Sequence, residues 1–95
     1  MKLIHRERLA EFSKKHSDSE ASLNAWQKNM ESNSFKNFVE LKNTFGSVDY
    51  LKPHVVFNIS GTKYRLIGVV NYELGTVAVK DVLTHPEYDR GTWRK

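Results

Sequence analysis

The chain has no cysteine among its 95 residues. Disulfide bonds, zinc sites built on thiolates and cysteine nucleophiles are therefore excluded, and the composition fits a reducing cytoplasm. No stretch approaches the roughly 20 apolar residues of a membrane-spanning helix. The N-terminal residues become charged before an apolar run can build up, so a secretory signal peptide is not expected. These absences lead us to expect a cytoplasmic protein with no membrane segment.

Motifs for metals and for nucleotide phosphates are also missing. The five glycines are scattered along the chain, so they form no glycine-rich phosphate loop. The four histidines, His5, His16, His54 and His85, do not have the spacing of metal ligands. We expect neither a metal nor another cofactor.

What the sequence does contain is an excess of positive charge on a chain long enough for one domain. A length of 95 residues supports one compact core, so we expect a single domain over residues 1–95. Fifteen Lys and Arg against eleven Asp and Glu give a net charge of +4. This sign favours polyanions such as RNA, because each neutralised phosphate releases counterions. The same charge could serve solubility alone.

The first half of the chain has the periodicity of helices and the second half that of strands. Apolar residues recur at helical spacing after a short N-terminal strand, and they alternate at strand spacing further on. Ser17 and Glu20 match a capping box for the second helix. The expected order is a strand at 1–4, helices at 6–16, 17–32 and 35–45, and strands at 48–51, 54–59, 63–74 and 76–84. This order predicts an α+β fold with N-terminal helices on one face of an antiparallel sheet, the other face being at least partly open.

The cluster after the last expected strand carries the clearest potential for chemistry. His85 can exchange a proton near neutral pH, and Tyr88 can do so if cations lower its pKa. Glu87 and Asp89 lie beside them in the sequence. The alternative is a capped turn into a C-terminal helix, with no catalytic role. Trp93 could stack on a base or, alternatively, pack against the domain or a partner.

Arg65 is the second candidate for chemistry. A guanidinium group on a strand face can bind a phosphate through two hydrogen bonds and stabilise charge that develops on it. The alternative is an ordinary surface arginine paired with Glu73 or Asp81. Lys63 and Lys80 lie on neighbouring strands and could extend a basic track for RNA.

Three motifs in this order resemble the HigB family of toxins, within the RelE-like superfamily. They are Val56-Phe57-Asn58, Tyr64-Arg65-Leu66-Ile67 and Thr84-His85-Pro86-Glu87-Tyr88-Asp89. The resemblance runs over most of the chain and is strongest from His54 to Asp89. It implies a single RelE-like toxin domain, and a metal-independent, ribosome-dependent mRNA endonuclease that is the toxin of a type II toxin–antitoxin pair.

The resemblance also implies roles for individual residues. The ribose 2′-OH of the mRNA would attack the adjacent phosphate, with Arg65 stabilising the phosphorane. His85 and Tyr88 would share the acid and base roles, and Asp89 or Glu87 would orient them. The residues expected to hold RNA are Lys63, Lys80 and Arg90. The implied partner is a HigA-like helix-turn-helix antitoxin, through which alone the toxin would contact operator DNA.

Two other functions remain open at this stage. The same fold occurs in ParE-like toxins that act on DNA gyrase, and such a toxin would leave mRNA intact. A non-catalytic RNA-binding module would bind RNA in a salt-sensitive manner without cutting it.

Overall fold

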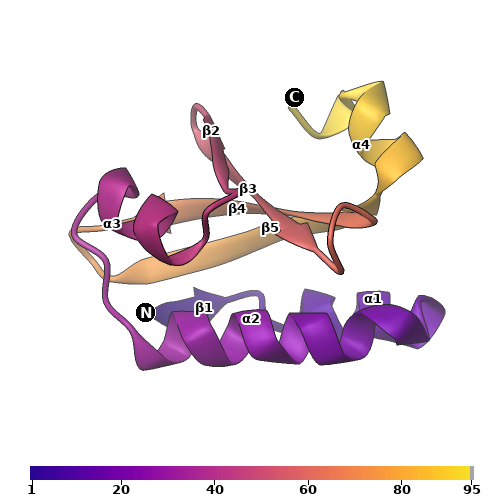
Figure 1. The fold of residues 1–95 in the computed structure, drawn as a ribbon, viewed down its shortest axis with the longest axis horizontal. Coiled ribbons are helices and arrows are strands. Elements are labelled where there is room, and N and C mark those ends of the chain that lie inside the picture. The colour runs from indigo at the N-terminus through magenta and orange to yellow at the C-terminus, as the bar shows by residue number, and fades with distance from the viewer. Residues whose placement is uncertain (95) are drawn as a thin grey trace.

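The computed structural model describes residues 1–94 and has an α+β fold, as predicted (Figure 1). Two short 3-10 helices, η1 and η2, accompany the main elements. The order is β1 (Lys2–Ile4), α1 (Glu7–Lys15), η1 (Ser17–Ser19), α2 (Glu20–Ser32), α3 (Phe38–Thr44), β2 (Asp49–Leu51), β3 (His54–Ile59), β4 (Tyr64–Asn71), β5 (Thr76–Thr84), α4 (His85–Arg90) and η2 (Thr92–Arg94). Within residues 1–94, no helix is both long and apolar enough to cross a membrane.

The five strands form one mixed sheet in the order β1-β5-β4-β3-β2. Strands β2 to β5 pair antiparallel, as predicted, but β1 pairs parallel with β5. The prediction of a wholly antiparallel sheet is therefore wrong at this edge. The helices carry the chain away from β1 and β5 returns beside it in the same direction, so this pair has a parallel ladder.

The main core lies between the sheet and the first three helices. On β3, the alternate residues Val55, Phe57 and Ile59 face this core, together with Trp26 of α2 and Leu41 of α3. The Trp26 and Phe57 rings meet edge to face at 5.2 Å. The period-2 pattern of β3 thus fixes which side of the sheet the helices cover.

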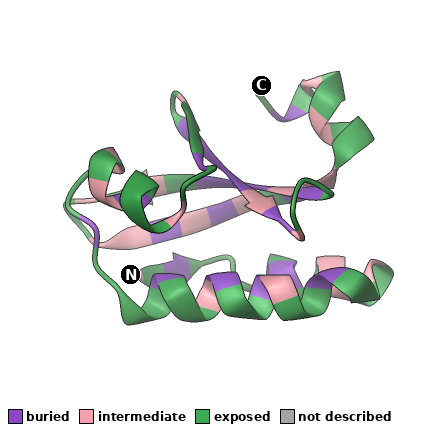
Figure 2. Ribbon diagram, viewed as in Figure 1, coloured by how far each residue is buried: buried purple, intermediate pink, exposed green. Residues whose placement is uncertain are grey.

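The opposite face of the sheet, here called the outer face, is covered in part by the C-terminal segment. Val56 and Ile67 on this face bury Trp93 of η2, and Leu83 and Tyr88 pack around them. Helix α4 stands on the side of the sheet away from α1 and α2 (Figure 1). It has no buried residue and remains largely exposed (Figure 2).

Three boundaries differ from the sequence prediction because polar side chains set them. The capping box at Ser17 and Glu20 does not form, since α2 begins at Glu20 and the Ser19 hydroxyl donates to the His16 carbonyl at 2.6 Å. Helix α3 begins later than expected because the Asn37 side chain accepts from the Glu40 N–H at 3.0 Å. Strand β4 ends at Asn71, whose side chain starts the turn to β5.

Candidate functional site

Helix α4 leaves the end of β5 through a capping box. The Thr84 side chain accepts from the Glu87 N–H at 3.4 Å, and the Glu87 carboxylate accepts from the Thr84 N–H at 2.9 Å. This bond from Thr84 lowers the pKa of Glu87. Pro86 lies in the first turn, and Gly91 ends the helix with a φ of 73°. The structure thus forms the predicted capped turn into a C-terminal helix, and Glu87 has a structural task in it.

Thr84→Ala is expected to lower the free energy of unfolding by about 1 kcal/mol, because it removes the side-chain acceptor at the start of α4. Urea unfolding followed by circular dichroism measures this loss. Thr84→Ser, which keeps a hydroxyl acceptor, is the matched control and is expected to lose much less. Equal stability of the alanine variant and the parent would contradict the role given to the capping box.

Helical spacing places Tyr88 and Asp89 on the same side of α4 as His85. Residues three and four positions apart lie on the same side of a helix, whereas Glu87 is turned away from His85. His85 Nδ1 lies 3.0 Å from Asp89 Oδ2, and both side chains are exposed to solvent. This contact engages Nδ1, so Nε2 is the ring nitrogen left for another partner.

Arg65 lies on the outer face of β4, beneath α4. Its cross-strand neighbours are Asn58 on β3 and Leu83 on β5. The guanidinium carbon is 5.3 Å from the centre of the Tyr88 ring, and one nitrogen donates to the Thr62 carbonyl at 2.5 Å. Among residues 1–94, Arg65 forms no ion pair with an acidic side chain, so the predicted pairing with Glu73 or Asp81 is wrong.

Trp93 fixes the position of Tyr88 over the sheet. The two rings stack at 5.1 Å with an interplanar angle of 13°, and Trp93 Nε1 donates to the Tyr88 carbonyl at 2.9 Å. Only 6% of Trp93 is exposed, so of its two predicted roles, packing against the domain is confirmed. The segment 84–89 thus places Tyr88 against Arg65 on the outer face, and His85 lies one turn earlier on the same helix.

Lys80 and His54 form a pair on the outer face that the sequence analysis did not identify. Lys80 Nζ lies 2.8 Å from His54 Nε2, and His54 is 5% exposed. The Trp93 ring and the imidazole meet edge to face at 5.4 Å between centroids. The available signal was the strand alternation, which puts His54 on the same face as Val56. The pairing with Lys80 needs the register of three strands and was not accessible.

Acidic conditions are expected to destabilise the protein through His54. Burial, and secondly the Lys80 ammonium group, hold the pKa of His54 below its ordinary 6.5. The unfolded chain therefore gains more protons than the folded chain as the pH falls below that value, and the free energy of unfolding decreases. Urea unfolding between about pH 7.5 and about pH 5.5 measures this slope. His54→Gln is expected to flatten it, and an unchanged slope in that variant would contradict the assignment.

The other predicted RNA-binding residues lie apart from Arg65. The Lys63 ammonium group pairs with Asp18 of η1, which also accepts from the Tyr64 hydroxyl at 2.7 Å. These bonds lower the pKa of Asp18 and raise that of Lys63. Lys63 is thereby tied to the helical layer. Arg90 lies on the opposite side of α4 from Tyr88, about half a turn away, where it lines a groove.

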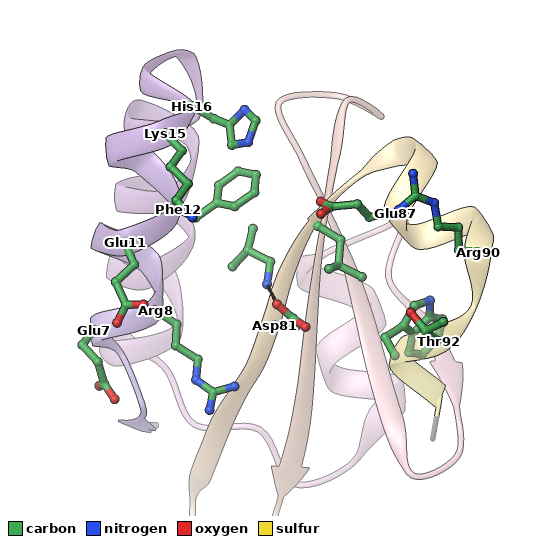
Figure 3. Close-up of a pocket in the computed structure, with 13 residues that line it drawn as sticks. Glu7, Arg8, Glu11, Phe12, Lys15, His16, Asp81, Glu87, Arg90 and Thr92 are labelled. Atoms are coloured by element: carbon green, nitrogen blue, oxygen red, sulfur yellow. Dashed lines mark hydrogen bonds between the residues drawn. The ribbon is translucent and has the colours of Figure 1, made fainter.

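This groove runs across β5 between α1 and α4 and has a volume of about 800 Å³ (Figure 3). Both signs of charge line it, among them Arg8, Lys15, Asp81, Glu87 and Arg90. Burial raises the pKa of Asp81, whose carboxylate accepts from the Val82 N–H at 3.1 Å. Arg65, His85 and Tyr88, here called the outer-face site, do not line this groove. Trp93, which stacks on Tyr88, does line it.

Comparisons with known proteins identify the family of this chain. A family model described as HigB_toxin, the RelE-like toxic component of a toxin-antitoxin system, matches residues 19–91. The mRNA interferase toxin HigB of Escherichia coli K12 is 33% identical over 92 residues, which cover 94% of this chain and 88% of that protein. The mRNA interferase HigB of Shigella flexneri matches to the same extent. The chain therefore belongs to the HigB family of RelE-like toxins, whose members act in toxin–antitoxin systems and so have an antitoxin as their partner.

Proposed function

We propose that this protein is an endoribonuclease that cleaves mRNA as the toxin of a type II toxin–antitoxin pair. Its relatives are named mRNA interferases, and the outer-face site has the groups that this reaction needs. The observation that carries the proposal is the position of the Arg65 guanidinium over the Tyr88 ring, with His85 on the adjoining turn of α4. The guanidinium and the phenol are in contact on the outer face, and helical spacing puts the imidazole on the same side of α4 as the phenol.

The proposed reaction begins with attack of a ribose 2′-OH on the adjacent phosphate. His85 takes the 2′-OH proton at Nε2, because Asp89 already binds Nδ1 at 3.0 Å. The phosphorus becomes five-coordinate, and the Arg65 guanidinium stabilises the charge on its oxygens. Tyr88 gives a proton to the departing 5′-oxygen. The products are a 2′,3′-cyclic phosphate and a 5′-hydroxyl, and solvent restores the two protonation states.

Asp89 rather than Glu87 is the better orienting group for this chemistry. The Glu87 carboxylate is engaged with Thr84 at 2.9 Å and faces away from His85. Of the three predicted RNA-holding residues, Lys80 lies on the outer face with Arg65 and Tyr88. Lys63 and Arg90 would contact more distant parts of a strand. No step in this scheme requires a metal ion.

The site of action and the partners follow from the same proposal. We expect the toxin to act in the cytoplasm on mRNA held by the ribosome, which would present an extended strand to an open, basic surface. The antitoxin would be a HigA-like helix-turn-helix protein, and operator DNA would be contacted through it alone. None of these features depends on the groove between α1 and α4.

Expression in a bacterial host tests the proposal directly. Growth arrest, rescue by the cognate antitoxin and new 5′ ends in primer extension on cellular transcripts are the expected results. Intact transcripts together with DNA-damage signalling would contradict it in favour of a ParE-like action on gyrase. Binding of RNA without cleavage, even on purified ribosomes, would contradict it in favour of a non-catalytic module.

A further inference from the structure

His54 is a buried histidine on the outer face that the proposed reaction does not use. It begins β3, two residues before Val56, and therefore lies on the same side of the sheet. The Trp93 ring shields it from solvent. A polar ring buried to this degree requires a polar partner.

The geometry of the pair with Lys80 defines the state of the imidazole. An ammonium group has three donors and no acceptor, so His54 Nε2 must accept and the ring proton must lie on Nδ1. Burial and the neighbouring positive charge keep the ring in this neutral form at neutral pH by lowering the pKa of His54. His54 is therefore a hydrogen-bond acceptor for Lys80.

Side-chain contacts connect this pair to the proposed catalytic groups without a break. Lys80 binds His54, the His54 ring contacts Trp93, Trp93 stacks on Tyr88, and the Tyr88 ring contacts the Arg65 guanidinium. All five side chains share the outer face. Lys80 is only partly buried, so part of its side chain faces solvent on the outer face.

We propose that His54 is a positioning residue whose Nε2 lone pair holds the Lys80 ammonium group on the outer face, where it binds a phosphate that flanks the scissile one. This inference rests on the proposed function. A lysine side chain has four rotatable bonds and loses much conformational freedom when it binds a phosphate. A side chain already held in place loses less, and the RNA binds more tightly.

The test measures the affinity for an RNA oligonucleotide whose 2′-hydroxyls are methylated, so that it cannot be cleaved. His54→Leu and Lys80→Met are each expected to weaken binding by about tenfold, as for loss of a hydrogen bond to a charged group. The double variant is expected to bind no more weakly than Lys80→Met, because both changes remove the same contact. His54→Gln, whose amide oxygen can accept the bond, is expected to keep most of the affinity.

The salt dependence of binding separates a lost phosphate contact from general damage to the fold. Each contact with a single strand contributes about 0.7 to the slope of log affinity against log salt. The slope is therefore expected to fall by up to about 0.7 in His54→Leu and Lys80→Met alike. Lys28→Met, which removes a lysine from the exposed side of α2, is the matched control. Parental affinity in a folded His54→Leu variant, or losses that add in the double variant, would overturn the positioning role.

The experiment keeps this inference separate from the proposed nuclease activity, because binding is measured without cleavage. If the methylated RNA binds through His54 and Lys80 but natural mRNA is not cut on ribosomes, the nuclease proposal fails and the positioning role is supported. If mRNA is cut while binding is independent of His54, only the positioning role fails.

Discussion

Arg65→Ala is expected to slow mRNA cleavage by about 10²- to 10³-fold, which is the usual effect of removing one group that stabilises transition-state charge. The guanidinium lies on the outer face over Tyr88 and is not paired with an acidic side chain among residues 1–94. Its positive charge is thus available to the phosphorane oxygens. Single-turnover cleavage of an mRNA on purified ribosomes measures the rate of the chemical step.

Two companion variants make the result for Arg65 specific. Arg65→Lys keeps the charge but loses the planar pair of donors, so an intermediate rate is expected. Urea unfolding of Arg65→Ala should show little change, since Trp93 continues to anchor Tyr88. If the folded alanine variant cleaves at the parental rate, the phosphate does not bind at Arg65 and the site assignment is wrong.

His85→Ala is expected to lower the same cleavage rate by about 10²- to 10⁴-fold, the range for loss of a positioned general base. The side chain is half exposed and contacts Asp89 on its own helix, so its removal should leave the fold intact. Asp89→Asn is expected to lose less, because the base remains and only its orientation is weakened. The rate of single-turnover cleavage measures both variants.

The comparison between His85→Ala and Glu87→Gln separates catalysis from capping. Glu87→Gln keeps an oxygen that can accept from Thr84, so we expect cleavage near the parental rate. A large loss in Glu87→Gln with a parental rate in His85→Ala would reverse the roles given to these two residues.

Much of the fold followed from local patterns in the sequence. The alternation over His54–Ile59 predicted β3, which is confirmed, and the structure shows that Val55, Phe57 and Ile59 face the helices. Leu23, Trp26 and Met30 recur at helical spacing, and the structure buries all three on one side of α2. Such features depend on residues a few positions apart, which is why periodicity reveals them.

The features that sequence reasoning missed depend on residues far apart in the chain. The parallel pairing of β1 with β5 joins Lys2 to Thr76, and no local pattern encodes it. The contact between His54 and Lys80 spans 26 positions and requires two strand registers. The capping box was misplaced because Ser17 and Glu20 have the same spacing as Thr84 and Glu87, and only the three-dimensional structure shows which pair forms.

The order of elements along the chain has a consequence for a toxin that would cleave mRNA on the ribosome. Helix α4 and Trp93 follow every strand of the sheet, and translation proceeds from the N-terminus. A chain that ends at Thr84 contains Arg65 but lacks His85, Tyr88 and the Trp93 indole that stacks on Tyr88. Under the proposed function, the nuclease would therefore be complete only after the C-terminal residues of the chain have been added.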